Sequence, residues 1–291
     1  MSILQAIFLG IVQGVTEFLP VSSSGHLVIL QNIFGMETDG GMLFDVMLHV
    51  GTLVAVCAVY RKDLWKMIRE AILICADIAA NVKIFFKNRR DQEALRYRRI
   101  IHNNYRKFVL LIIVSTIPTG IIGYVGRDLV EIAGKTLLVP GVCLLLTGIL
   151  LIVAQLSEDG HKIPRDVSYV NAFFIGIAQG LSTLPGLSRS GTTITACLLS
   201  GFERKFALKY SFIMSIPAIL GAAVLELKDI GNETISAGMV GNCIVGAIVA
   251  GAVGFVCMKT MLVVVRKKSF KGFATYCIAV GIVAIVMHFV L

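Results

Sequence analysis

The chain has 291 residues, of which 56% are hydrophobic and only 15% charged. A soluble domain of this size carries more charge, so composition argues against a water-soluble protein. The formal net charge of +9 could suggest nucleic acid. Most basic residues, however, lie in loops between apolar runs, where they set membrane orientation. We therefore expect an all-α polytopic membrane protein that lies in the bilayer and does not bind nucleic acid.

The apolar runs predict two broken segments and six spanning helices. Residues 2–35 and 172–202 each consist of two short apolar pieces around a proline, a pattern that predicts a re-entrant helical hairpin. The longer runs approach the ~20 residues needed to cross a bilayer. The predicted spanning helices cover residues 42–60, 108–125, 137–155, 206–226, 236–257 and 273–291.

The segment 61–107 holds thirteen Lys or Arg residues against five Asp or Glu residues. Its most apolar part, 68–86, contains charges that each cost roughly 2.5–3.5 kcal/mol near the centre of a spanning helix. We therefore expect 68–86 to form an amphipathic helix at the cytoplasmic interface. If the basic loops are cytoplasmic, both termini lie outside.

A pattern of sixteen residues occurs twice. Residues 10–25 and 176–191 align without a gap and share seven identical residues, which indicates an internal duplication. The chain then divides into a first repeat, 1–155, and a second repeat, 170–291. Each repeat has one hairpin and three spanning helices, and this odd number predicts that the second repeat is inverted in the membrane. Inverted repeats with broken helices place a site near the bilayer midplane, here where the hairpin tips meet.

The polar residues at the tips predict a binding site for a phosphate or diphosphate. Serines precede a helix in both copies, and the free N–H groups at a helix start attract anions. Arg189 adds a guanidinium that can hold two phosphate oxygens. The predicted diphosphate-binding residues are Ser22, Ser24, Gly25, Ser188, Arg189, Ser190, Gly191 and Thr193.

Glu17 is a carboxylate in an otherwise apolar run, and such a residue marks a functional site by default. Gln13 lies four residues earlier, on the same helix face. Together with a diphosphate and water, these two oxygen donors are predicted to hold a divalent cation, Mg²⁺ or Ca²⁺. The predicted catalytic residues are Glu17, Ser23, His26 and Arg189. Ser23 is the preferred nucleophile with His26 as its base, and direct attack by His26 remains the alternative.

These motifs resemble those of a known family. Gln13-xxx-Glu17 followed by PVSSSGH, ending at His26, resembles the (E/Q)xxxE and PxSSxGH signature of the bacitracin-resistance undecaprenyl-diphosphate phosphatases. PGLSRSGTT at 185–193 resembles that family's PGxSRSxxT motif. Gln in place of Glu at the first position lowers the negative charge around a metal. The functional set that the resemblance implies is Glu17, Ser23, His26, Ser188, Arg189 and Thr193.

The resemblance implies a multi-pass enzyme of the bacterial cell membrane with an inverted-repeat fold. Its substrate would be a prenyl diphosphate lipid: undecaprenyl diphosphate is hydrolysed to undecaprenyl phosphate and inorganic phosphate with a divalent cation. This reaction recycles the lipid carrier for peptidoglycan and confers bacitracin resistance.

A transporter or flippase is the rival function, because inverted repeats with hairpins are typical of transporters. A coupled transporter usually needs ionisable residues along its spanning helices, and 108–125 and 137–155 have almost none. A purely structural scaffold explains neither Glu17 nor Arg189. The sequence leaves open whether the protein forms a homodimer.

Overall fold

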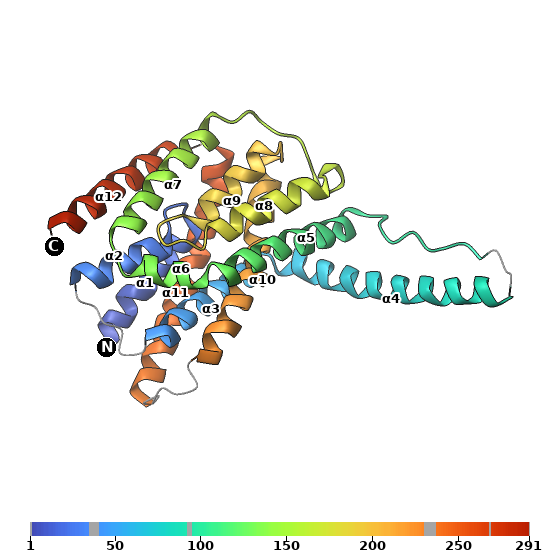
Figure 1. Ribbon diagram of the computed structural model, residues 1–291, viewed down its shortest axis with the longest axis horizontal. Helices are drawn as coiled ribbons and strands as arrows, with labels where there is room; N and C mark the ends of the chain where they lie inside the picture. Colours follow the sequence, from blue (N-terminus) through green and yellow to red (C-terminus); the bar gives the residue numbers. More distant parts are fainter. Residues whose placement is uncertain (1, 35–40, 92–94, 230–236, 268, 291) are drawn as a thin grey trace.

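The computed structural model describes residues 2–34, 41–91, 95–229, 237–267 and 269–290, which form α-helices and one 3-10 turn but no strand. The first half contains α1 (Ile3–Phe18), α2 (Ser23–Phe34), α3 (Gly41–Val59), α4 (Arg61–Asp91), α5 (Asn104–Val125), α6 (Arg127–Gly134) and α7 (Leu138–Leu156). The second half contains α8 (Tyr169–Leu181), α9 (Arg189–Leu199), α10 (Arg204–Asp229), α11 (Ala237–Arg266) and α12 (Lys271–Val290). Figure 1 shows one helical body from which α4 projects.

Among the described residues, five helices are long and apolar enough to cross a bilayer, namely α5, α7, α10, α11 and α12. They confirm five of the six predicted apolar helices. The sixth, predicted at 42–60, is α3, which passes the same test only together with α4, and the two helices meet at an angle of 86°. The protein is therefore an all-α polytopic membrane protein.

The two predicted hairpins are present as pairs of short helices, α1 with α2 and α8 with α9. The longest of the four, α1, has 16 residues, and at about 1.5 Å per residue it is shorter than the ~30 Å hydrocarbon core. Ser2 and Ser168 cap α1 and α8, because their hydroxyls accept hydrogen bonds from backbone amides three residues later. None of the four hairpin helices is therefore long enough to span a bilayer alone.

Each hairpin packs against the other half of the chain. α1 lies against α11, and α8 lies against α5 (Figure 1). Glycines permit this approach: a Cβ on Gly14 would lie 2.7 Å from the carbonyl oxygen of Ala250, and one on Gly176 would lie 2.2 Å from that of Ser115. Each hairpin thus packs on a helix of the other repeat, which is the packing expected of two repeats related by a two-fold axis. The inversion of the repeats across the membrane stays a prediction.

The basic segment after α3 differs from the expectation in length. α4 is continuous from Arg61 to Asp91, whereas 68–86 was the predicted amphipathic helix. Arg106, at the start of α5, is buried and donates hydrogen bonds to Glu70 at 2.9 Å and to Asp77 at 2.6 Å. These hydrogen bonds lower the pKa of both carboxyl groups below their ordinary values. The long helix is thus tied to the body by a cation that the sequence pattern did not single out.

Close packing between α3 and α11 makes a stability prediction. A Cβ on Gly51 would lie 2.1 Å from the carbonyl oxygen of Ala247, so we expect Gly51→Ala to force the helices apart and cost about 1–3 kcal/mol. Melting of the purified protein in detergent measures the effect. Gly221→Ala is the matched control, because a Cβ added at Gly221 would meet no atom within 4 Å. Equal melting temperatures for the two variants would contradict this account.

Candidate active site

The first hairpin turns between Phe18, the last residue of α1, and Ser23, the first residue of α2. Ser22 has φ of 70°, a left-handed conformation that costs a non-glycine residue about 1–3 kcal/mol. Its hydroxyl accepts a hydrogen bond from the amide of Gly25 at 3.3 Å and so caps α2. This strained turn brings Ser23 back beside Glu17, in the last turn of α1.

The second hairpin is capped in the same way. The hydroxyl of Ser188 accepts a hydrogen bond from the amide of Gly191 at 3.1 Å, and the duplicated pattern aligns these two residues with Ser22 and Gly25. The left-handed residue here is Gly186, with φ of 91°. The two tips therefore have the same type of serine cap, but the residue with left-handed backbone lies at a different position of the pattern in each tip.

The tips contact each other reciprocally. A Cβ on Gly25 would lie 2.7 Å from the Cα of Gly186, and one on Gly191 would lie 3.4 Å from the Cβ of Pro20. The alignment makes these two contacts equivalent, since Gly25 corresponds to Gly191 and Pro20 to Gly186. The convergence of the hairpin tips that the sequence predicts is confirmed.

The carboxylate of Glu17 lies at the centre of this contact, with its side chain 4% exposed. Arg189 donates a hydrogen bond to its Oε1 at 2.6 Å. Ser23 Oγ and Gln13 Nε2 donate to its Oε2 at 2.6 and 2.9 Å. His49 Nδ1 lies 3.7 Å from the same oxygen and accepts a hydrogen bond from Gln13 Nε2 at 3.1 Å. A carboxylate with three donors and no unpaired oxygen is held in its ionised form.

Three buried polar atoms at the site have no hydrogen-bond partner in the part of the chain that the structure describes. They are Nη1 of Arg189, Oγ1 of Thr192 and Oε1 of Gln13. Leaving such an atom unpaired costs about 1–3 kcal/mol each, so a bound ligand that pairs with it regains that energy. The two donor groups suit phosphate oxygens, and the amide oxygen suits a cation.

Thr192 is a residue that the sequence analysis missed in favour of its neighbour. The hydroxyl of Thr193 donates to the carbonyl oxygen of Arg189 at 2.8 Å and lies 2.5 Å from Ser211 Oγ. Thr193 is four residues after Arg189, the spacing at which a threonine bonds back to its own helix. Thr192 follows Ser188 at the same spacing, so the sequence held no signal that favoured Thr192, and the role of Thr193 in binding diphosphate stays a prediction.

The hydrogen bonds of the His26 imidazole go to Ser22 and Tyr276 and not to Ser23. Its Nδ1 lies 2.7 Å from the carbonyl oxygen of Ser22, which can only accept, so Nδ1 carries the proton. Its Nε2 lies 2.7 Å from the hydroxyl of Tyr276 in α12, and the two rings stack. Tyr276 was missed because nothing in either motif indicates a residue 250 positions away.

The remaining predicted serines line the tips without reaching Glu17. Ser24 Oγ lies 3.4 Å from Ser22 Oγ. In the second copy, Ser190 Oγ lies 3.3 Å from Ser188 Oγ and donates to the carbonyl oxygen of Leu19. These contacts are structural, and binding of phosphate by the same hydroxyls stays a prediction.

Comparison with known proteins agrees with the motifs. The family model "Bacitracin resistance protein BacA" matches residues 6–283. A relative from Methanosphaera stadtmanae named undecaprenyl-diphosphatase is 39% identical over 292 residues, covering 100% of both chains. Relatives of the same name from Alkaliphilus metalliredigens and Methanobrevibacter smithii are 39% and 40% identical, covering 98% and 97% of this chain and 98% and 96% of theirs.

The chain belongs to the bacitracin resistance protein BacA family. The family signature places its polar residues in two motifs, and in this BacA family member both motifs lie at the one contact between the hairpins. The resemblance seen in the sequence is thereby confirmed over nearly the whole chain.

Glu17 and Gln13 offer the oxygen donors for the predicted divalent cation. Among the described residues, no group of three or more His, Cys, Asp or Glu side chains converges. Glu17 and the unpaired Oε1 of Gln13 are two adjacent oxygen donors. Mg²⁺ is commonly held by one or two protein oxygens together with substrate phosphates and water. The residues fit a cation that the diphosphate helps to hold, and its presence stays a prediction.

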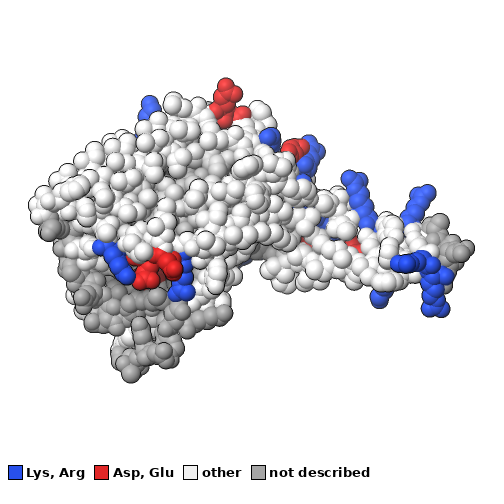
Figure 2. All heavy atoms as spheres, viewed as in Figure 1, with Lys and Arg blue, Asp and Glu red and all other residues white. Residues whose placement is uncertain are grey.

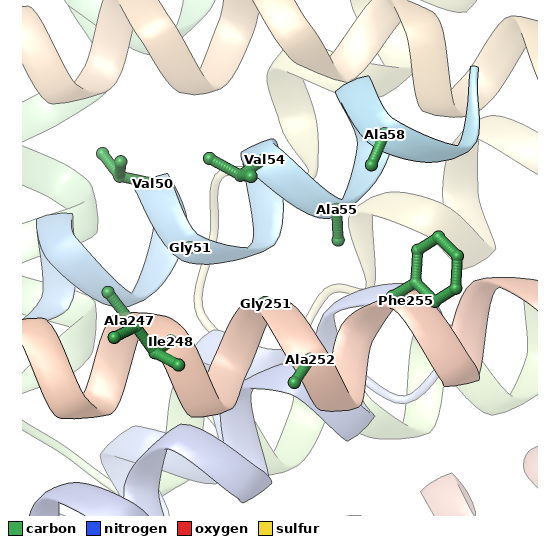
Figure 3. A pocket seen from close by; sticks show the side chains of 10 residues that line it. All are labelled: Val50, Gly51, Val54, Ala55, Ala58, Ala247, Ile248, Gly251, Ala252 and Phe255. Carbon is green, nitrogen blue, oxygen red and sulfur yellow. The ribbon is translucent and has the colours of Figure 1, made fainter. Parts of the chain in front are cut away.

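An apolar groove of about 360 Å³ lies between α3 and α11 (Figure 3). One of its lining residues, Val50, follows His49 in the sequence, and His49 contacts Gln13 beside the carboxylate. Every residue that lines the groove is apolar or glycine. Its lining residues are Val50, Gly51, Val54, Ala55, Ala58, Ala247, Ile248, Gly251, Ala252 and Phe255.

The buried ion pair makes a second prediction, about coupling. We expect Glu17→Gln and Arg189→Met each to lower stability by up to about 3–5 kcal/mol, because each leaves a buried charge unpaired. The double variant should lose much less than the sum, and melting of all three in detergent measures this.

The matched control is the exposed pair formed by Glu131 and Lys135. Glu131→Gln, Lys135→Met and their double variant should all melt like the wild type. Additive losses at Glu17 and Arg189 would show that the two charges are not coupled.

Proposed function

We propose that this protein hydrolyses undecaprenyl diphosphate to undecaprenyl phosphate and inorganic phosphate, and so recycles the lipid carrier for cell-wall synthesis and confers bacitracin resistance. Membership of the BacA family and full-length similarity to relatives named undecaprenyl-diphosphatase support the proposal. The observation that carries it is the meeting of Glu17 and Arg189 at the hairpin tips, beside donors that lack partners.

The diphosphate of the substrate occupies the space at the tips, and the prenyl chain follows the groove between α3 and α11. Nη1 of Arg189 and Oγ1 of Thr192 are two unpaired donors for phosphate oxygens. The apolar walls of the groove match a hydrocarbon chain, and its wall α3 also carries His49, which contacts Gln13 at the polar site.

Charge balance supports a divalent cation at the site. Glu17 and Arg189 neutralise each other, so a bound diphosphate adds an excess of negative charge in a buried place, which is costly. A cation held by Glu17, Gln13 and the diphosphate would offset that charge and polarise the phosphoryl oxygens. The protein's own contribution is to fix the two oxygen donors and the guanidinium around it.

Ser23 is the nucleophile in this proposal. Its hydroxyl donates to Glu17 Oε2 at 2.6 Å, so the carboxylate is placed to take the proton as Oγ attacks the terminal phosphorus. The Oγ–P bond forms, the bond from phosphorus to the bridging oxygen breaks, and undecaprenyl phosphate leaves. Water then cleaves the phosphoserine, which releases inorganic phosphate and restores the hydroxyl.

Glu17 takes the place that the sequence analysis gave to His26, as the base for Ser23. Direct attack by His26 is the alternative, and it would first require Nε2 to leave the hydroxyl of Tyr276. Placement of the protein in the bacterial plasma membrane is likewise a proposal, supported by its spanning helices and its family.

A phosphate-release assay on purified protein in detergent distinguishes hydrolysis from the rival function, transport without hydrolysis. We expect the wild type to release phosphate from undecaprenyl diphosphate, and Glu17→Ala and Arg189→Ala each to lower the rate by at least about a hundredfold, as loss of charge stabilisation does. Glu131→Ala, which removes an exposed carboxylate, is the control and should keep full activity. No release by the wild type would refute the proposal.

The identity of the nucleophile is tested by trapping the phosphorylated enzyme. With substrate labelled in the terminal phosphate, acid quenching should yield label on Ser23, found by mass analysis of peptides, because a phosphoserine survives acid. Ser23→Ala should abolish the label, while Tyr276→Phe should retain it. Label on His26 after an alkaline quench, which preserves phosphohistidine, would instead establish the alternative.

A further inference from the structure

The long helix α4 carries an exposed apolar stripe. Trp65, Ile68, Ile72, Val82 and Phe86 recur at spacings that keep them on one helix face. Their exposed fractions run from 49% for Val82 to 71% for Trp65. A water-exposed stripe of this length is unusual for a helix that protrudes from a protein and marks an interaction surface.

The charges on α4 are sorted between its two faces. The acidic residues Asp63, Glu70 and Asp77 all face the body, where they bond Lys209 or Arg106. The side chains of Lys62, Lys66, Arg69, Lys83 and Arg89 are exposed. Figure 2 shows basic side chains gathered around the free end of the projecting helix. The outer surface of the described helix is thus apolar and basic.

The direction of α4 fits the plane of a bilayer. α3 packs along α11, one of the helices long and apolar enough to span. α4 leaves α3 at 86°, so it runs nearly perpendicular to α3. A helix that lies flat with an apolar face and basic flanks has the form of an interfacial helix.

We propose that α4 binds the surface of an anionic lipid bilayer, with its apolar stripe in the headgroup region and its basic side chains on lipid phosphates. Lys and Arg near an anionic surface are attracted to it, and Trp favours the interface. A second copy of this chain is the less suitable occupant. Two such surfaces would bring like charges together along both flanks, with the acidic side chains already paired on the inner face.

Trp65 is the only tryptophan in the sequence, so the fluorescence of the whole protein reports on α4 alone. The full-length protein is placed as one copy per nanodisc, in phosphatidylcholine alone or mixed with phosphatidylglycerol. We expect the anionic discs to shift Trp65 emission to the blue, lower its quenching by acrylamide several-fold and allow quenching by brominated acyl chains. Raising the salt concentration should reverse part of this change.

Two variants with equal loss of charge test the role of the basic flank. The combined Lys62→Gln, Lys66→Gln and Arg69→Gln variant should lose most of the response to anionic lipid. The control combines Lys205→Gln, Lys267→Gln and Lys271→Gln, which are exposed residues outside α4, and should respond like the wild type. The salt series on unmodified protein tests the same point if the first variant does not fold.

Three results would overturn the proposal. Trp65 emission and acrylamide quenching could be the same in anionic discs as in detergent, so that α4 stays in water. The response could be equal in both lipid compositions, which would remove the role of charge. Protection of Trp65 could also require two copies per disc, which would assign the stripe to a second protein chain.

Discussion

The ion pair between Glu17 and Arg189 joins two hairpins that lie 172 residues apart in the sequence. Burying two charges costs several kcal/mol per ion, and mutual attraction offsets this only when further hydrogen bonds are satisfied. Ser23 and Gln13 donate such bonds to Glu17, but Nη1 of Arg189 finds no acceptor within the described chain. The pair is therefore complete on the carboxylate side and incomplete on the guanidinium side, which is the side that an anionic substrate can complete.

Glycine residues allow the helices to approach closely enough for Glu17 and Arg189 to meet. Gly25 and Gly191 lie where a side chain would strike the opposite tip, and Gly14 and Gly176 let α1 and α8 approach neighbouring backbones. The reciprocal contacts of Gly25 with Gly186 and of Gly191 with Pro20 follow the alignment of the duplicated pattern. Duplication therefore explains the geometry of the site as well as the order of the helices, since one turn design is used twice with different polar side chains.

Sequence reasoning reached the helices, the hairpins and the Glu17–Arg189 convergence because each rests on a local pattern or a repeat. It failed where a residue's partner is set by packing. Tyr276 reaches His26 from the last helix, and Arg106 reaches across to Glu70 and Asp77, with no motif to announce either. Thr192 and Thr193 are neighbours of the same residue type, and only the direction in which each side chain leaves α9 distinguishes them. α4 extends beyond the expected 68–86 because the charged residues on either side of that range are mostly Lys and Arg, which are good helix formers.

The close contact between the two hairpin tips also helps to decide whether the protein is a transporter or an enzyme. A transporter of this architecture would have to part its repeats around the site during each cycle. Here the parting surface consists of glycine backbone in close contact, bridged by a buried ion pair whose separation would expose each charge to an apolar surrounding. Ser23 is held within hydrogen-bond distance of the carboxylate by the strained turn at Ser22. A turn that stores strain to fix one hydroxyl against one base is better suited to chemistry at a stationary site than to a gate that opens and closes.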